Sequence, residues 1–183
     1  LNRLEASLAA SNTVKPAALP VINTPPDVIV SYGPAMLVPI DGTPVFKDVS
    51  GTRFKRVINT QALIVRTDFG DTLYLHVYDG WMTSDTMNGP WTQGSAPFGL
   101  DGLATTLAKS DHVDLLDGGP HANPKPTLAN GAPTIYVTAK PSELIIFKGE
   151  PNFVPLPGTN LLWASNTAAD VFVETTNNDY YIL

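Results

Sequence analysis

An internal repeat constrains the fold of this chain more than any other feature of its sequence. Residues 26–60 align without a gap with residues 133–167, which lie 107 positions further along, and 11 of the 35 aligned pairs are identical. After one inserted residue the match resumes with Val65 opposite Val173 and ends with Leu75 opposite Leu183. Because the matched residues are mainly turn formers and apolar residues, we interpret the repeat as a duplicated structural unit.

The first repeat consists of short apolar runs separated by turn signals. Gly33-Pro34 separates the first two runs, Asp41-Gly42 favours a tight hairpin, and Asp79-Gly80 predicts a second one. Short runs that are rich in β-branched and aromatic residues are typical of antiparallel sheets. The runs cover residues 28–32, 35–40, 45–49, 53–59, 63–67, 73–77 and 81–83.

These patterns predict an all-β fold with minor helix, built from tandem antiparallel β repeats. We expect a β-propeller-like arrangement first, because short-stranded units are repeated and the first ends in tryptophan motifs. A pseudo-symmetric β-sandwich and a pair of small barrels are the alternatives. The expected organisation is a short helix and Pro-rich linker (residues 1–25), a first β repeat (26–97), a helical and Pro/Gly-rich linker (98–132) and a second, incomplete β repeat (133–183).

Two segments outside the repeats have helical character. Leu1, Leu4 and Leu8 fall on one face of a helix over residues 1–11, which is also rich in alanine. A broken leucine stripe over residues 100–116 predicts the second helix. Because the first helix starts without a cap, we expect an upstream part of the protein to be missing.

The second repeat is shorter than the first. Leu183 matches Leu75, so residues 133–183 hold no counterpart of the strand around Trp81 or of Gly89-Pro90-Trp91. A second unit that folds like the first therefore has an unpaired edge, which is an aggregation hazard. We expect another polypeptide or subunit to complete this edge by strand addition.

The composition excludes several partners. Only 15% of the residues are charged and the net charge is −6, so the chain offers no basic surface for nucleic acid or for an anionic membrane. No run approaches the roughly 18 apolar residues that span a bilayer. The sequence contains no cysteine, which excludes disulfides and thiolate metal sites.

Three stretches of the sequence resemble a known family. They are Pro-Ala-Met-Leu-Val-Pro-Ile-Asp-Gly-Thr-Pro at residues 34–44, Val-Ile-Asn-Thr at 57–60, and Leu-Tyr-Leu…Asp-Gly-Trp…Asn-Gly-Pro-Trp at 73–91. They resemble bacterial envelope or secreted repeat proteins that are sometimes described as "carbohydrate-binding family V/XII". This resemblance implies a periplasmic, cell-surface or extracellular location, and it implies that both ends of the chain are internal to a larger protein.

Aromatic residues are the first candidate site. Trp81, Trp91 and Tyr78 are candidates for a platform that binds sugar rings, because flat aromatic faces match the apolar face of a pyranose. The alternative, which we favour for Trp81 and Trp91, is that they anchor a corner of the sheet, with one indole packed on the other. Trp163 lies opposite Arg56 in the repeat, so it is the better candidate for an exposed aromatic.

The densest group of potential metal ligands lies in the linker between the repeats. Carboxylates together with imidazoles suit calcium or zinc, depending on geometry. The spacing matches no known metal-binding loop, so acidic residues of an ordinary linker are the simpler interpretation. The candidates are Asp111, His112, Asp114, Asp117 and His121.

No catalytic motif stands out. His76 would serve as a general base only if a carboxylate such as Asp79 approached it. There is no Gly-x-Ser-x-Gly elbow and no phosphate-binding glycine loop. We therefore expect a non-enzymatic envelope or extracellular module that acts through assembly. A carbohydrate-binding module that takes up polysaccharide is the alternative, and a hydrolase of unknown type comes third.

Overall fold

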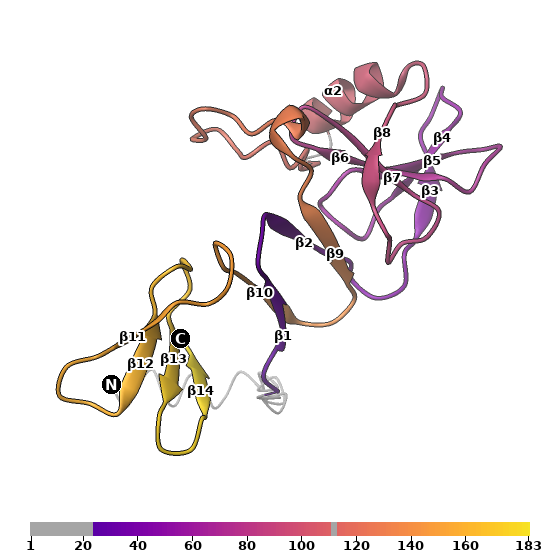
Figure 1. Ribbon diagram of the computed structural model, residues 1–183. Coiled ribbons are helices and arrows are strands. Elements are labelled where there is room, and N and C mark those ends of the chain that lie inside the picture. Colours follow the sequence, from indigo (N-terminus) through magenta and orange to yellow (C-terminus); the bar gives the residue numbers. More distant parts are fainter. Residues whose placement is uncertain (1–23, 111–112) are drawn as a thin grey trace, which may run out of the picture.

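The structure is a computed structural model that describes residues 24–110 and 113–183 (Figure 1). The expected helix over residues 1–11 and most of the linker that follows it lie outside the described residues. Each repeat forms its own antiparallel sheet, and pairs of parallel strands connect the two repeats.

The sheet of the first repeat has six strands in sequential order. Each neighbouring pair is antiparallel, and the β6–β7 hairpin turns through Tyr78 and Asp79, with Val77 paired to Gly80. Tyr78 takes a positive φ of 57° in this tight turn. The strands are β3 (Phe46–Asp48), β4 (Phe54–Val57), β5 (Ile64–Thr67), β6 (Leu73–Val77), β7 (Gly80–Ser84) and β8 (Thr92–Gly94).

Helix α2 (Leu100–Ser110) packs on one face of this sheet. Its leucine spacing makes it amphipathic, and it buries Leu100, Ala104 and Leu107 in a cluster that also contains Phe54 and Val65 of the sheet. The opposite face carries a second core, so the first sheet is buried on both sides. The predicted helix is confirmed over residues 100–110 and ends before the two leucines at 115 and 116.

The sheet of the second repeat has four strands, also in sequential antiparallel order. They are β11 (Phe153–Pro155), β12 (Leu161–Ala164), β13 (Val171–Glu174) and β14 (Tyr180–Ile182). A short 3₁₀ turn, η1 (Leu128–Asn130), lies in the linker between the repeats and buries Leu128. No helix covers the second sheet among the residues that the structure describes.

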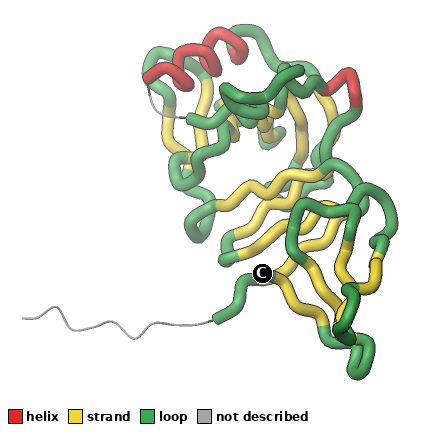
Figure 2. Tube along the Cα trace, turned by 90° about the vertical axis from the view of Figure 1, so that its left-hand side faces the viewer, coloured by secondary structure: helices red, strands yellow, loops and turns green. Residues whose placement is uncertain are grey.

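Strands of one repeat pair with strands of the other, between the two sheets (Figures 1 and 2). β1 (Asp27–Ser31) is parallel to β10 (Ser142–Ile146), and β2 (Ala35–Pro39) is parallel to β9 (Thr134–Thr138). β9 is the counterpart of β1 in the repeat, and β10 is the counterpart of β2. The exchange is therefore reciprocal and pseudo-symmetric.

These parallel pairs correct two expectations. Gly33-Pro34 separates two strands that do not pair with each other, and Asp41-Gly42 joins strands of different sheets instead of closing a hairpin. The positions of the apolar runs were predicted correctly. Their pairing partners were not, because they lie about a hundred residues away and turn signals report only on neighbouring runs. The all-β class with minor helix is confirmed, whereas the described strands do not form blades around a common channel.

The strand register also corrects the repeat alignment. Ile64 pairs with Leu75 in the first sheet, and Val171 pairs with Ile182 in the second. Both pairs keep the separation of 107 residues, so no residue is inserted and Ile182 is the true counterpart of Leu75. The identity of Val65 with Val173 suggested the insertion. Val65 in fact corresponds to Phe172, which faces away from the pocket described below.

One asparagine in each repeat fixes the loop before the third strand. Asn59 accepts a hydrogen bond from the amide of Val45 (2.9 Å) and donates to the carbonyls of Asp41 (2.7 Å) and Thr43 (2.9 Å). Asn166 accepts a bond from the amide of Asn152 (2.8 Å), and its side chain donates to two carbonyls in the same way. This shared pattern of hydrogen bonds explains why the asparagine recurs in both repeats.

Candidate functional site

An apolar pocket of about 410 Å³ opens between the β1–β10 pair and one face of the second sheet. We call this face of β11–β14 the pocket face and its reverse the outer face. Several lining side chains are unusually exposed for their type, including Tyr32 at 54% and Tyr180 at 66%. The pocket is lined by Val28, Val30, Tyr32, Ile145, Phe147, Pro151, Phe153, Val171, Tyr180 and Ile182.

The corresponding region of the first repeat is a filled core. Phe46 and Leu75 of that core match Phe153 and Ile182 of the pocket at the separation of 107 residues. In the first repeat the space is occupied by Met82 of β7, by Trp91 and by Leu128. The first two come from the segment beyond β6, and residues 133–183 contain no counterpart of that segment.

Strand β14 forms one border of the second sheet. It pairs with β13 on one side, and no described strand pairs with its other side. In the first repeat the equivalent strand β6 is central, because β7 pairs with it. The ring of Tyr180 lies edge-on to Phe153 with 6.2 Å between the ring centroids, so aromatic side chains stand beside the free edge.

Tyr181 points to the outer face and interacts with a carboxylate. Its hydroxyl donates a hydrogen bond to Glu174 Oε2 at 3.2 Å. That hydrogen bond, together with the negative charge of Glu174, raises the pKa of Tyr181 because both favour the neutral phenol.

Two of the predicted ligand-binding tryptophans are buried. Trp81 is 4% exposed and belongs to the core beneath α2, where its indole N–H donates to Asp101 at 2.7 Å. Trp91 is 8% exposed, belongs to the core on the other face of the sheet, and donates to the carbonyl of Met87 at 3.2 Å. The two indoles therefore lie in separate cores and do not stack, and neither offers a face to a sugar.

The other two aromatic candidates lie elsewhere. Tyr78 is half-buried in the β6–β7 turn and packs against the core that contains Trp91. Trp163 is half-buried on the outer face of the second sheet, in a cross-strand row with Phe172 and Tyr181. The prediction of carbohydrate binding consequently rests on Trp163 and Tyr78.

The predicted metal ligands are only partly described, because Asp111 and His112 lie outside the described residues. Asp114 Oδ1 accepts a hydrogen bond from the amide of Leu116 at 2.7 Å. Asp117 binds the amide of Gly119 and the ammonium group of Lys125, and this ammonium group lowers the pKa of Asp117. The described carboxylates of this group thus hold the linker itself, and His121 is exposed.

His76 has a structural environment. Its Nδ1 lies 2.7 Å from the carbonyl oxygen of Leu115, and its ring stands edge-on to Trp81 with centroids 4.9 Å apart. A carbonyl only accepts hydrogen bonds, so Nδ1 carries the proton. Asp79 accepts instead from the amide of Leu128 at 2.9 Å, so His76 and Asp79 form no catalytic pair.

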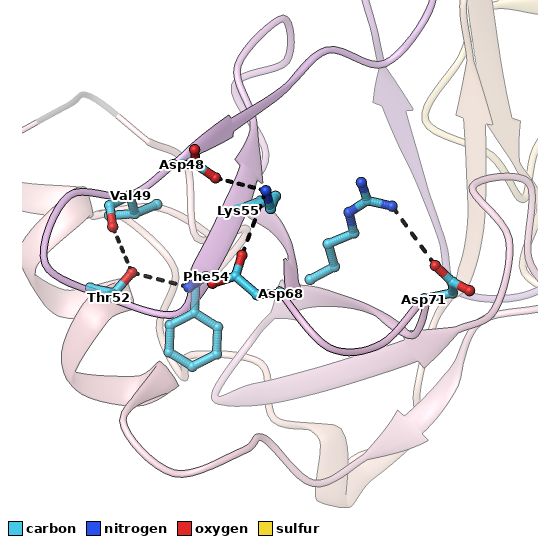
Figure 3. A network of polar contacts seen from close by, with 8 residues as sticks. Asp48, Val49, Thr52, Phe54, Lys55, Asp68 and Asp71 are labelled. Carbon is cyan, nitrogen blue, oxygen red and sulfur yellow. Dashed lines mark hydrogen bonds and ion pairs between the residues drawn. The ribbon is translucent and has the colours of Figure 1, made fainter.

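A charged cluster lies on β3, β4 and β5 of the first sheet and in the loop after β5 (Figure 3). Lys55 Nζ lies 2.9 Å from Asp48 and 3.7 Å from Asp68, and the bond to Asp48 raises the pKa of Lys55. Arg66 lies 4.0 Å from Asp71 and stacks over the ring of Phe46 at 4.2 Å. These cations are already paired with carboxylates, so the cluster holds the loop and presents no site for an anion.

A wider depression, of about 810 Å³, lies beside β2 and the Asn59 loop. Two of its polar side chains are engaged within the protein: Thr60 donates to the carbonyl of Pro39 at 2.7 Å, and Lys140 lies 3.8 Å from Asp27. No buried side-chain nitrogen or oxygen lacks a hydrogen-bond partner in residues 24–110 and 113–183. Within those residues, the depression therefore meets no buried polar group that is left without a partner.

Sequence reasoning predicted the incomplete second repeat but missed the pocket that results from it. Tyr32, Phe153 and Tyr180 were not singled out. The repeat contained the necessary signal, because each of the pocket residues Phe153, Val171, Tyr180 and Ile182 is the counterpart of an apolar residue in the first core.

No protein-family model, curated protein or solved structure matches this chain. The resemblance to envelope repeat proteins consequently stays a prediction. Among the helices within the described ranges, none is long and apolar enough to cross a membrane.

Proposed function

We propose that this protein is a non-enzymatic assembly module of the bacterial envelope or extracellular space, which binds an apolar β-hairpin of another polypeptide at its second repeat. The observation that carries the proposal is the apolar pocket beside the free edge of β14. A free edge supplies unpaired backbone groups for strand addition, and adjoining pockets supply specificity for side chains.

The first repeat supports the chemistry proposed for the bound hairpin. There β7 pairs with β6, and Met82 and Trp91 fill the core that the pocket matches. A partner should therefore supply one strand to pair with β14, followed by a large apolar or aromatic side chain that enters the pocket. Pairing of such a strand with β14 would bury the free backbone groups of both strands and cover the exposed ring of Tyr180.

The direct test uses a fluorescent peptide with the sequence of residues 77–94, because Leu183 occupies the position of His76 and Val77 would follow in register. We expect saturable binding to the chain, measured by fluorescence anisotropy. A matched peptide with Met82→Ala and Trp91→Ala keeps the same backbone and should bind at least tenfold more weakly, because each lost side chain removes on the order of 2–5 kcal/mol of burial.

A second chain, which carries residues 77–94 appended directly after Leu183, provides the control. Its own hairpin should occupy the edge, so it should not bind the free peptide and should unfold at a higher temperature. Equal binding of the peptide to both chains, or binding to neither together with an unchanged unfolding temperature, would refute the proposal.

A further inference from the structure

We propose that residues 1–11 of this chain bind, as a helix, to the outer face of the second sheet, where they take the place that α2 has on the first. This site lies on the reverse of the pocket face and does not depend on the proposed function. The inference rests on three observations, which concern the face, the sequence of the segment and the path of the chain.

The outer face of the second sheet is largely apolar, and no helix within the described ranges covers it. One cross-strand row runs through Val154, Trp163, Phe172 and Tyr181, all on the same face because paired residues share a face. None of these four side chains is buried, and Tyr181 is 45% exposed.

The same row in the first repeat is more polar, and α2 covers only the part of it around Val65 and Tyr74. Its members are Lys47, Arg56, Val65 and Tyr74, of which Val65 is completely buried beneath α2. The second repeat replaces the two cations of this row by Val154 and Trp163. At the positions that pack with α2 in the first repeat, the second keeps apolar residues at Leu161 and Phe172, and Asp170 replaces the buried Leu63. The apolar row thus offers a helix surface to bury beside one charged position.

The segment that we propose as the cover resembles α2 in sequence. Residues 1–14 align without a gap with residues 100–113, and six of the 14 pairs are identical. Leu1, Leu4 and Leu8 match Leu100, Leu103 and Leu107, and in α2 the first and last of these three are buried against the sheet. The remaining identical pairs are Ala9/Ala108, Ser11/Ser110 and Val14/Val113.

The path of the chain directs this segment to the second sheet. Helix α2 precedes β9, and β9 pairs with β2 of the first repeat, whose sheet α2 covers. Residues 1–11 precede β1, and β1 pairs with β10, which leads into the second sheet. By the pattern of α2, a helix in residues 1–11 would cover the sheet of the repeat with which β1 pairs.

The connection is long enough. Fifteen residues, 12–26, separate the segment from β1, and a chain of this length spans up to about 50 Å when extended. The connection from α2 to β9 has 23 residues and includes η1. The linker before β1 is therefore shorter than this connection.

One difference between the segment and α2 falls at a position that is buried in α2. Glu5 stands where α2 has the buried Ala104. In the first repeat the cluster around Ala104 includes the indole of Trp81, and the described part of the second repeat has no counterpart of it. In the proposed helix, the larger side chain of Glu5 would therefore have room, and a route to water, that Ala104 lacks.

The test exploits the absence of cysteine, which permits a single nitroxide label at an Ala6→Cys substitution, opposite the leucines on the helix. We expect the label to broaden the amide signals of β12 and β13 several-fold more than those of β4 and β5 in the full-length chain. Broadening that favours β4 and β5, or that favours neither sheet, would overturn the proposal.

Two controls separate the proposed contact from other causes. The labelled chain with Leu4→Asp and Leu8→Asp should lose the selective broadening, whereas the labelled chain with Ala10→Asp, on the polar side of the helix, should keep it. A mixture of labelled chain with isotope-enriched, label-free chain should show no broadening. Broadening in that mixture would mean that the helix binds a second copy, which contradicts docking within one chain.

Discussion

The two repeats share their turns and differ in what covers their sheets. Asn59 and Asn166 make the same three hydrogen bonds in their loops, so the strands before and after them are laid out alike. Yet Leu75 is completely buried, whereas its counterpart Ile182 is only half-buried. The comparison teaches that local hydrogen bonds set the arrangement of the strands, while a closed core needs additional elements.

The two repeats also differ in the charged residues of their sheets. Lys55 and Arg66 of the first sheet, which are held by aspartates, correspond to Leu162 and Val173 of the second. The repeat with the completed core thus has a polar rim, and the repeat with the open core has an apolar one. This contrast favours the second repeat as the surface for assembly.

The largest effect is expected at the residue that closes the first core. Trp91→Ala should lower the free energy of unfolding by about 3–5 kcal/mol, because the buried indole leaves a cavity. Urea unfolding followed by circular dichroism measures this loss. Phe98→Ala is the matched control, since Phe98 is 94% exposed and should leave stability unchanged. A loss below about 1 kcal/mol for Trp91→Ala would mean that the first core is not closed as described.

A pair of equivalent substitutions measures the difference between the cores directly. Leu75→Ala should cost about 2–5 kcal/mol and Ile182→Ala less than about 1 kcal/mol, because only the first side chain is fully buried. The same denaturation experiment applies to both. In the chain that carries residues 77–94 after Leu183, the cost of Ile182→Ala should rise towards that of Leu75→Ala. Equal costs in the unextended chain would contradict the asymmetry.

The shared turns provide the opposite expectation. Asn59→Ala and Asn166→Ala should each cost about 1–3 kcal/mol, because each removes three hydrogen bonds to backbone groups of a loop. Hydrogen exchange of the loop amides Val45 and Asn152 reports each loss separately. The two turns would not be equivalent if Asn59→Ala exposed the amide of Val45 to exchange while Asn166→Ala left the amide of Asn152 protected, or the reverse.

The smallest effect concerns pH and the outer face of the second sheet. The pKa of Tyr181 is raised by Glu174, so the folded state retains the phenol proton at a pH where the unfolded chain loses it. This contribution to stability is complete below the usual tyrosine pKa of about 10 and disappears as the pH rises through the folded value. Absorbance titration of tyrosinate should show one late phenol, which Glu174→Gln moves to lower pH. A titration that Glu174→Gln leaves unchanged would rule out this contact.

The sequence predicted the strands well, because their signals are local. The run at residues 73–77 coincides with β6, and Asp79-Gly80 lies at the β6–β7 turn. The parallel partners of β1 and β2 could not be read in this way, because they lie in the other repeat and no turn connects them. The absence of the strand from residues 133–183 was predicted from the repeat alone. The pocket could be inferred only once Met82 and Trp91 were seen inside the core of the first repeat.

The tryptophans illustrate a second limit of the sequence. Trp81 and Trp91 lie ten residues apart and were expected to pack on one another. They face opposite sides of the sheet, so Trp81 packs beneath α2 and Trp91 closes the other core. The side of the sheet on which a residue lies depends on strand register, which the loop between β7 and β8 changes without a visible sequence signal.

The reciprocal pairing of β1 with β10 and of β2 with β9 makes this chain equivalent to a covalently fused dimer. A single repeat on its own would have both of these strands without partners, and two separate copies would satisfy all four by exchanging them. Fusing the two copies in tandem makes their association intramolecular, so that it no longer depends on the protein concentration. Gene duplication would thus have made a symmetric pair independent of dilution, and it left each half free to diverge.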